Sequence, residues 1–295
     1  MRRTPPPDKK GTNTMSFQII SDSCFDYPYL ADDISWIKRV PLYIELDGEV
    51  FTDNENLRCT GLITKMAASS SAPKSSCASP GNFLEAFECG ADDVYVITLS
   101  DKVSGSYASA IVAANMFKEK YPDRNIFVFS SRSAAAGQVA LGEKLYELAS
   151  SGMPFAEVMR HGLKFVDEMS TYFVLENLDV FRKNGRLSHL QSIVTGALRI
   201  KLVMGADSSG NVCVRGKALS TDGAISKMID MIAARISPAE AKTRKLYISH
   251  CQCPERARLV RDSILKKVPF KDSLILRTGG ISTIYANDGG FVLAY

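Results

Sequence analysis

The first half of the chain repeats a short apolar run, a polar turn and a helix-like segment, and this repeat constrains its fold more than any other feature. The runs at 17–20, 94–99 and 126–129 are almost continuously apolar, which is typical of strands covered on both faces. Segments rich in small residues follow two of these runs, at 105–120 and 134–150, and have the length of helices. Repeats of this kind predict a parallel sheet with helices on both faces.

Local signals refine this prediction between the first and second apolar runs. The segment 37–46 is expected to be extended, because Pro41 disfavours a helix at the residue before it. Asp47-Gly48 then predicts a hairpin turn. Ser79 is expected to cap a helix that begins at Pro80, since proline is favoured at the first helical position.

The pattern changes after residues 151–154, a Ser-Gly-Met-Pro breaker that we take as the domain boundary. A helix is expected directly after it. Strands are then predicted at 172–175, 198–204, 212–216, 246–250, 274–278 and 291–295. The tight turn at 207–210 makes its flanking strands antiparallel, so the second half is predicted to be an α+β layer. The predicted division is a disordered tail (1–14), an N-terminal α/β domain (15–152) and a C-terminal domain (153–295).

Composition excludes several classes of function. The 295 residues carry a net charge of only +4 and no basic stripe, so nucleic acid is not an expected partner. No apolar run approaches the ~18 residues that a membrane span needs. Seven scattered cysteines, without a signal peptide, favour reduced thiols in the cytoplasm. The pair Cys251 and Cys253 lacks further ligands at metal-binding spacing, so we expect no metal and no cofactor.

Hydroxyl side chains cluster at the predicted strand ends. Residues 21–23, 100–106 and 130–133 each follow a strand, and residues 74–79 are predicted to form a fourth polar loop. Ligands of open parallel sheets lie beyond the carboxyl ends of the strands, and hydroxyls beside helix starts suit an anionic head group. Each serine taken alone is better explained as a helix cap. Their convergence at one sheet edge favours a binding site.

Two further features could have a catalytic or ligand-binding role. Ser104 precedes Gly105 at a strand-to-helix turn, but the Gly-x-Ser-x-Gly spacing of a nucleophile elbow is absent. A serine hydrolase that uses Ser104 with His189 as its base therefore stays an alternative. Arg186, in a turn after Gly185, could hold a carboxylate through its paired N–H groups or could simply lie at the surface.

Taken in order, these segments resemble the motifs of the DegV family, the fatty-acid-binding proteins of bacterial fatty acid kinase systems. The matching segments are 20–23, 40–42 with Asp53, 75–81, 99–107 with Ala110, 185–188, and 198–201 with Lys217. The resemblance implies a parallel three-layer α/β/α N-terminal domain and a two-layer α/β C-terminal domain with a mostly antiparallel sheet. It also implies a lipid tunnel between the two domains.

The resemblance further implies a long-chain fatty acid whose carboxylate is held by the hydroxyls of Ser75, Ser76 and Ser104, and a separate kinase subunit that phosphorylates it. No catalytic residue is expected in this chain. The full set of predicted ligand-binding residues is Ser75, Ser76, Ser104, Gly105, Ser106, Asp22, Ser23, Arg186 and Asn287. The family's C-terminal histidine is missing from 287–291. Asn287 is expected to hydrogen-bond the acid in its place, but because it cannot be protonated, the protein is expected to be a poor acyl donor to the kinase. A module for another amphipathic anion is the remaining alternative.

Overall fold

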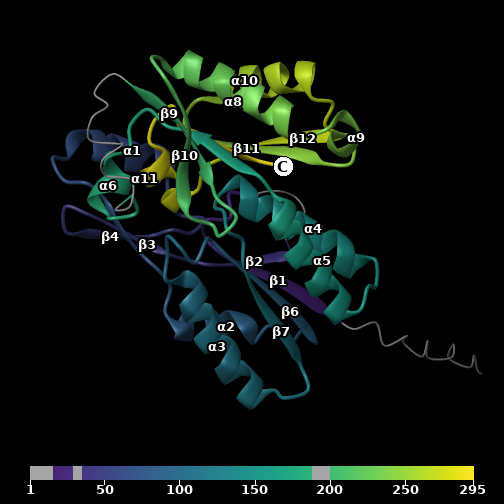
Figure 1. The fold of residues 1–295 in the computed structure, drawn as a ribbon. Coiled ribbons are helices and arrows are strands. Elements are labelled where there is room, and N and C mark those ends of the chain that lie inside the picture. The colour runs from purple at the N-terminus through teal and green to yellow at the C-terminus, as the bar shows by residue number, and fades with distance from the viewer. Residues whose placement is uncertain (1–15, 29–34, 188–199) are drawn as a thin grey trace, which may run out of the picture.

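The computed structural model describes residues 16–28, 35–187 and 200–295, and these residues form three sheets (Figure 1). The first sheet has the order β2-β1-β6-β7, and every neighbouring pair is parallel. Its strands are β1 (Phe17–Asp22), β2 (Ile37–Val40), β6 (Asp93–Thr98) and β7 (Asn125–Ser130). The predicted parallel sheet is therefore confirmed.

Helices cover both faces of this sheet, which explains its continuous apolar runs. The helices are α2 (Pro80–Phe87), α3 (Ser106–Lys120), α4 (Ala136–Ser150) and α5 (Phe155–Glu168). Val94 and Val96 of β6 pack in one core with α2 and α3. Tyr95 and Ile97 alternate with them and pack with α4 and α5 on the other face, as the period of a strand requires. Ser79 caps α2 in a capping box, as the sequence predicted.

A separate small sheet has the order β4-β3-β5, and its strand β3 follows β2 of the first sheet in the chain. It comprises β3 (Tyr43–Leu46), β4 (Glu49–Thr52) and β5 (Lys74–Ser76), and α1 (Cys59–Ala68) lies between β4 and β5 in the chain. The predicted hairpin is confirmed, because Asp47 and Gly48 both have positive φ values. The prediction of a loop at 74–76 was wrong. These three polar residues form a strand only because β3 offers them its free edge.

The second half forms a six-stranded sheet with the order β10-β9-β8-β13-β11-β12. Its strands are β8 (Thr171–Val174), β9 (Lys201–Ala206), β10 (Val212–Ala218), β11 (Lys245–His250), β12 (Asp272–Arg277) and β13 (Phe291–Ala294). All pairings except β11 with β12 are antiparallel, so the mostly antiparallel sheet is confirmed. The first residues of the strand predicted at 198–204 lie outside the described part of the chain.

One face of this second sheet packs against α8 (Thr221–Arg235) and α10 (Pro254–Lys267). The other face meets α4, which therefore packs between the two large sheets. Glu143 of α4 accepts hydrogen bonds from Tyr247 Oη and Lys245 Nζ of β11, both at 2.8 Å. The short helices α6 (Asp179–Lys183), α9 (Pro238–Ala241) and α11 (Gly280–Ala286) complete the described fold.

The first helix after the predicted boundary illustrates how closely the halves are joined. Helix α5 follows residue 152 in the chain, yet it packs on α4 and β7 of the first sheet. The division into two domains at residue 152 therefore stays a prediction. Within the described residues, no helix combines the length and apolar character needed to span a bilayer.

Candidate ligand-binding site

A cavity of about 310 Å³ lies between the two halves of the molecule, beyond the carboxyl ends of β1, β6 and β7. Its walls are mostly apolar and come from both halves. They include Leu42, Leu99, Val103, Phe173, Leu175, Phe181, Val212, Ile281 and Val292. This volume falls at the lower end of the range of small-molecule pockets, ~300–1,000 Å³. The cavity is therefore suited to an elongated apolar group.

Hydroxyl groups gather where β5 and α11 meet the cavity. Ser75, Ser76 and Ser104, three of the predicted ligand-binding residues, all line it. Ser75 Oγ shares a hydrogen bond of 2.8 Å with the phenol oxygen of Tyr285. Ser104 Oγ accepts a hydrogen bond from the backbone N–H of Ser106 at 3.1 Å, so its own proton remains available to a ligand.

Arg186 brings a positive charge to the same wall of the cavity. Its Nη1 donates to the carbonyl of Asn184 at 2.7 Å, and its Nε donates to the carbonyl of Val103 at 3.3 Å. Among the described residues, no carboxylate forms an ion pair with it. Because these bonds fix the guanidinium without neutralising it, its charge is available to an anion.

Tyr285 is a second donor that sequence reasoning did not identify. Burial raises the pKa of its phenol, while the bond to Ser75 and the charge of Arg186 oppose that rise. The phenol is therefore neutral near pH 7 and able to donate. Its ring packs against Phe181, with 4.7 Å between the ring centres. The one sequence feature that indicates this role is the spacing of Ser282 and Tyr285, which places the two hydroxyls about one helical turn apart in α11.

Asn287 lies at the end of α11 and does not line the cavity. It has a φ of 54°, and its Oδ1 accepts a hydrogen bond from the backbone N–H of Asp288 at 2.8 Å. Tyr285, two residues earlier, is the side chain that α11 directs to the hydroxyl groups. Asn287 therefore lies at the end of the helix, outside the group of hydroxyls that includes Ser75.

Asp22, Ser23 and Ser106 also lie behind the cavity wall rather than in it. The buried carboxylate of Asp22 accepts hydrogen bonds from the Leu99 backbone (2.9 Å) and from Ser106 Oγ (2.8 Å). Burial raises the pKa of this carboxyl group, and the surrounding hydrogen bonds partly offset the rise. Gly105 does line the cavity, and a side chain there would approach Cys77 Sγ to 3.3 Å. These residues join the ends of β1 and β6 to the start of α3.

Two buried carboxyl groups hold the start of α11. Asp53 accepts from the backbone N–H groups of Gly280 (2.8 Å) and Ile281 (3.0 Å), and from Ser23 Oγ (2.8 Å). Asp26 Oδ1 accepts from the Gly279 N–H at 2.9 Å, while its Oδ2 is buried without a hydrogen-bond partner. Burial raises the pKa of Asp26 to about 7. These contacts fix the helix that carries Ser282 and Tyr285 to the cavity.

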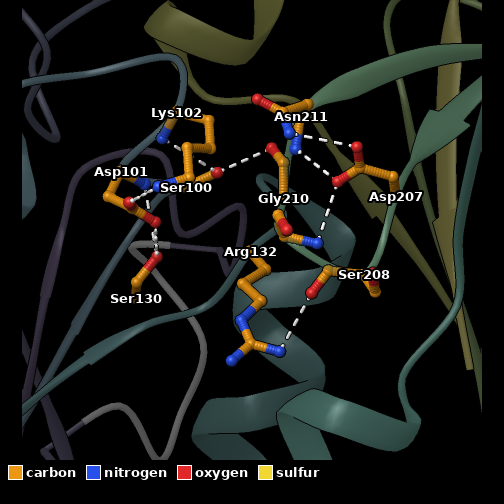
Figure 2. A network of polar contacts seen from close by, with 10 residues as sticks. Ser100, Asp101, Lys102, Ser130, Arg132, Asp207, Ser208, Gly210 and Asn211 are labelled. Atoms are coloured by element: carbon orange, nitrogen blue, oxygen red, sulfur yellow. Dashed lines mark hydrogen bonds and ion pairs between the residues drawn. The ribbon is translucent and has the colours of Figure 1, made fainter.

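A second polar group borders the cavity beyond β7. Figure 2 shows the turn between β9 and β10 lying over the ends of β6 and β7. Ser100 Oγ donates to the carbonyl of Gly210 at 2.8 Å, and Arg132 Nη1 donates to the carbonyl of Ser208 at 3.0 Å. Gly210 has a φ of +87°, and a side chain there would lie only 2.5 Å from Ser100 Oγ. The turn is thus closely fitted onto the first sheet.

The hydrolase alternative gains no support from the described residues. Ser104 lines the cavity, but its candidate base, His189, lies outside them. His161 is on α5 and contacts Arg160 and Glu157. His250 ends β11 and accepts from the Cys253 N–H. Neither of these two histidines lines the cavity.

Comparison with known proteins gives one consistent result. A family model described as an uncharacterised protein of the DegV family matches residues 16–295. A DegV domain-containing protein of Streptococcus gordonii is 33% identical over 284 residues, which cover 95% of this chain and 99% of that protein.

Two solved structures have the same fold. A DegV family protein of Ruminococcus gnavus, refined with vaccenic acid, has a TM-score of 0.90 and 39% identity, covering 96% of this chain and 100% of that one. The Fak B3 protein of the Streptococcus pneumoniae fatty acid kinase, loaded with linoleic acid, has a TM-score of 0.87 and 31% identity. That match covers 95% of this chain and 99% of the other.

Proposed function

The chain belongs to the DegV family, and from this premise we propose that it binds a long-chain fatty acid and presents the carboxylate to a fatty acid kinase subunit. The acyl chain occupies the cavity between the two halves. The chain itself acts as a binding protein without catalytic residues. Solved relatives that carry vaccenic and linoleic acid, one of them a fatty acid kinase B protein, support this proposal.

The observation that carries the proposal is the uneven distribution of polar groups in the cavity. Apolar side chains line most of it. The hydroxyls near β7 (Ser100, Ser133 and Thr171) are hydrogen-bonded to other protein atoms, whereas the opposite wall holds the available hydroxyl of Ser104 and the unneutralised guanidinium of Arg186. Each methylene removed from water contributes ~0.8 kcal/mol, so a sixteen-carbon chain contributes on the order of 11 kcal/mol before ordering costs. Burial of the chain therefore supplies most of the affinity, and the polar wall sets the ligand's orientation.

The proposed carboxylate contacts are the side chains of Ser75, Ser76, Ser104, Tyr285 and Arg186. Neutral hydroxyls and one cation together match a single negative charge. Gly105, Ser106, Asp22 and Ser23 support this wall through their neighbours. Asn287 is left out of the proposed contact set, because its side chain does not line the cavity and accepts a hydrogen bond from the Asp288 N–H instead.

We place the protein in the cytoplasm. All seven cysteines are free thiols in the structure, and Cys24 and Cys77 line the cavity itself. Reduced thiols at these positions fit a reducing compartment. The same compartment would contain the ATP-dependent kinase subunit that the proposal requires.

Native mass spectrometry of the protein, purified without added lipid, tests the proposal. We expect a bound species whose mass, after release, is that of a fatty acid. Ser104→Ala is expected to lower fatty-acid affinity about tenfold, because a hydrogen bond to a charged group contributes ~1.5–3 kcal/mol. Ser226→Ala, on the exposed surface of α8, is the matched control. Release of a different amphipathic anion, or retention of full affinity by Ser104→Ala, would contradict the proposal.

A further inference from the structure

The hydroxyls of Ser75, Ser76, Ser104 and Tyr285, together with Arg186, are called the hydroxyl wall. This wall and Arg132 lie at different ends of the cavity. Cys24, which follows β1, is 3.5 Å from Ser282 of α11 through their side chains, so the helix that carries Tyr285 of this wall lies on the β1 side. Arg132 follows β7, and β6 separates β7 from β1 in the sheet. Neighbouring strands are ~4.8 Å apart, so the ends of β1 and β7 are roughly 10 Å apart. Figure 1 likewise shows α11 and α5 on different sides of the molecule.

A small polar pocket of about 80 Å³ lies beyond the Arg132 end. Its lining includes Ser131, Asp167, Ser170, Asp207, Arg215 and Arg235. Among the residues that the structure describes, only Arg132, Thr171 and Ala206 line both this pocket and the large cavity. These three residues therefore form the partition between an apolar space and a polar one. Of the three, Arg132 alone has a long side chain.

Contacts from both halves of the molecule fix Arg132. Its Nη1 forms an ion pair with Asp167 Oδ1 of α5 at 2.7 Å and also donates to the Ser208 carbonyl, the contact drawn in Figure 2. Its backbone has a φ of 50°, a left-handed conformation that favours glycine. A side chain at Gly210 would approach the Arg132 Cα and Cβ to 3.0 Å. Arginine is thus held at a position where its backbone is strained.

We propose that Arg132 closes the cavity at the methyl end of the acyl chain and so sets the longest chain that the protein accepts. This inference rests on the proposed function. A chain that fits ends against the partition. A longer chain must push the methyl end against a charged, hydrogen-bonded guanidinium or into the polar pocket, and neither offers apolar surface to cover it.

Chain-length profiles test the proposal. Dissociation constants are measured for saturated fatty acids from twelve to twenty-four carbons, with the delipidated wild type and Arg132→Gly. For the wild type, affinity should rise about fourfold per added methylene and then stop rising at a limit. Arg132→Gly removes the side chain and suits the left-handed backbone, so the protein should fold. Its limit should move to chains at least two carbons longer, with affinity for shorter chains within about threefold of the wild type.

Arg235→Ala is the matched control, because Arg235 lines only the polar pocket and bonds Ser170 Oγ. Its limit should equal that of the wild type. Equal limits for the wild type and Arg132→Gly would overturn the inference and leave the proposed function intact, and so would an equal shift in Arg235→Ala. Failure of the wild type to bind any fatty acid would overturn the proposed function and this inference with it.

Discussion

The two ends of the cavity each carry an arginine, and the two arginines are held in different ways. Within the described part of the chain, the bonds of Arg186 go only to backbone carbonyls, and no carboxylate there neutralises it. Arg132 is paired with Asp167, an exposed ion pair whose side chains keep 38% and 63% of their surface accessible. A guanidinium fixed by carbonyls keeps its charge for a ligand, whereas one paired with a carboxylate serves as part of a wall. This difference distinguishes the end of the cavity that is suited to a carboxylate from the end that is suited to a methyl group.

The two ends also differ in what supports them. Behind the hydroxyl wall, the buried carboxyl groups of Asp26 and Asp53 hold the start of α11. At the other end, the partition depends on one exposed ion pair and on the fitted turn at Gly210. Loss of a buried hydrogen-bonded carboxyl group leaves backbone N–H groups unpaired, which costs ~1–3 kcal/mol each, whereas an exposed ion pair contributes ~0–1 kcal/mol. The hydroxyl wall is therefore expected to be the more rigid end.

The largest expected effect concerns Asp26. Its folded-state pKa of about 7 lies above the ordinary value of 3.8, so the folded state holds an extra proton between these pH values. Its contribution to stability is fully present below about pH 4 and is lost as the pH rises to about 7. The loss is on the order of 4 kcal/mol. Asp26→Asn should remove this component from the free energy of unfolding, measured by denaturant titration between pH 5 and pH 8.

Asp123→Asn, at an exposed position on the loop before β7, is the control and should follow the wild-type curve. If Asp26→Asn and the wild type lose stability in parallel over this pH range, Asp26 does not titrate there. The contrast in support between the two ends would then be weakened.

Removal of the free guanidinium is the next largest effect. Arg186→Ala should weaken fatty-acid binding about tenfold to a hundredfold, since charge-assisted hydrogen bonds contribute ~1.5–3 kcal/mol. Arg186→Lys should be nearly as weak, because it keeps the charge but loses the planar fork. Calorimetric titration with one fatty acid well below the length limit provides both values. Loss of the same size in Arg132→Gly with that acid would erase the distinction between the two ends.

The phenol of α11 should contribute less. Tyr285→Phe keeps the ring packing against Phe181 and removes the oxygen that bonds Ser75. A neutral hydrogen bond contributes ~0.5–1.5 kcal/mol, so affinity should fall about twofold to tenfold. Tyr107→Phe, on α3 outside the cavity lining, is the matched control. An unchanged affinity in Tyr285→Phe would limit the carboxylate contacts to the serines and Arg186.

The smallest expected effect is at the Arg132 end. Asp167→Asn removes an exposed ion pair, so stability should change by less than about 1 kcal/mol. The guanidinium would keep its bond to the Ser208 carbonyl but lose its anchor on α5. The chain-length limit should therefore move in the direction expected for Arg132→Gly, by a smaller step, in the same binding assay. A shift toward shorter chains would show that the pair holds the partition open rather than closed.

Local sequence patterns were sufficient to predict the first sheet and much of the hydroxyl wall. The apolar runs of β6 and β7, and the serines after β6, are set by neighbours in the chain. The same patterns missed β5, because three polar residues have no strand signal of their own. They also missed Tyr285, since the helix α11 is short and its start is capped by Asp26 and Asp53, more than 200 positions away in the chain.

By itself, the sequence determined a parallel sheet, an antiparallel pair of strands across the turn at 207–210 and a set of hydroxyls at strand ends. Periodicity and turn chemistry act between residues a few positions apart, so they can be read along the chain. The tertiary structure alone decided which hydroxyls meet, which arginine remains unneutralised and where the cavity ends. Ser75 meets Tyr285 and Arg132 meets Asp167 only after the two halves pack together on α4. Those contacts depend on the packing of whole sheets and helices, which no local pattern specifies.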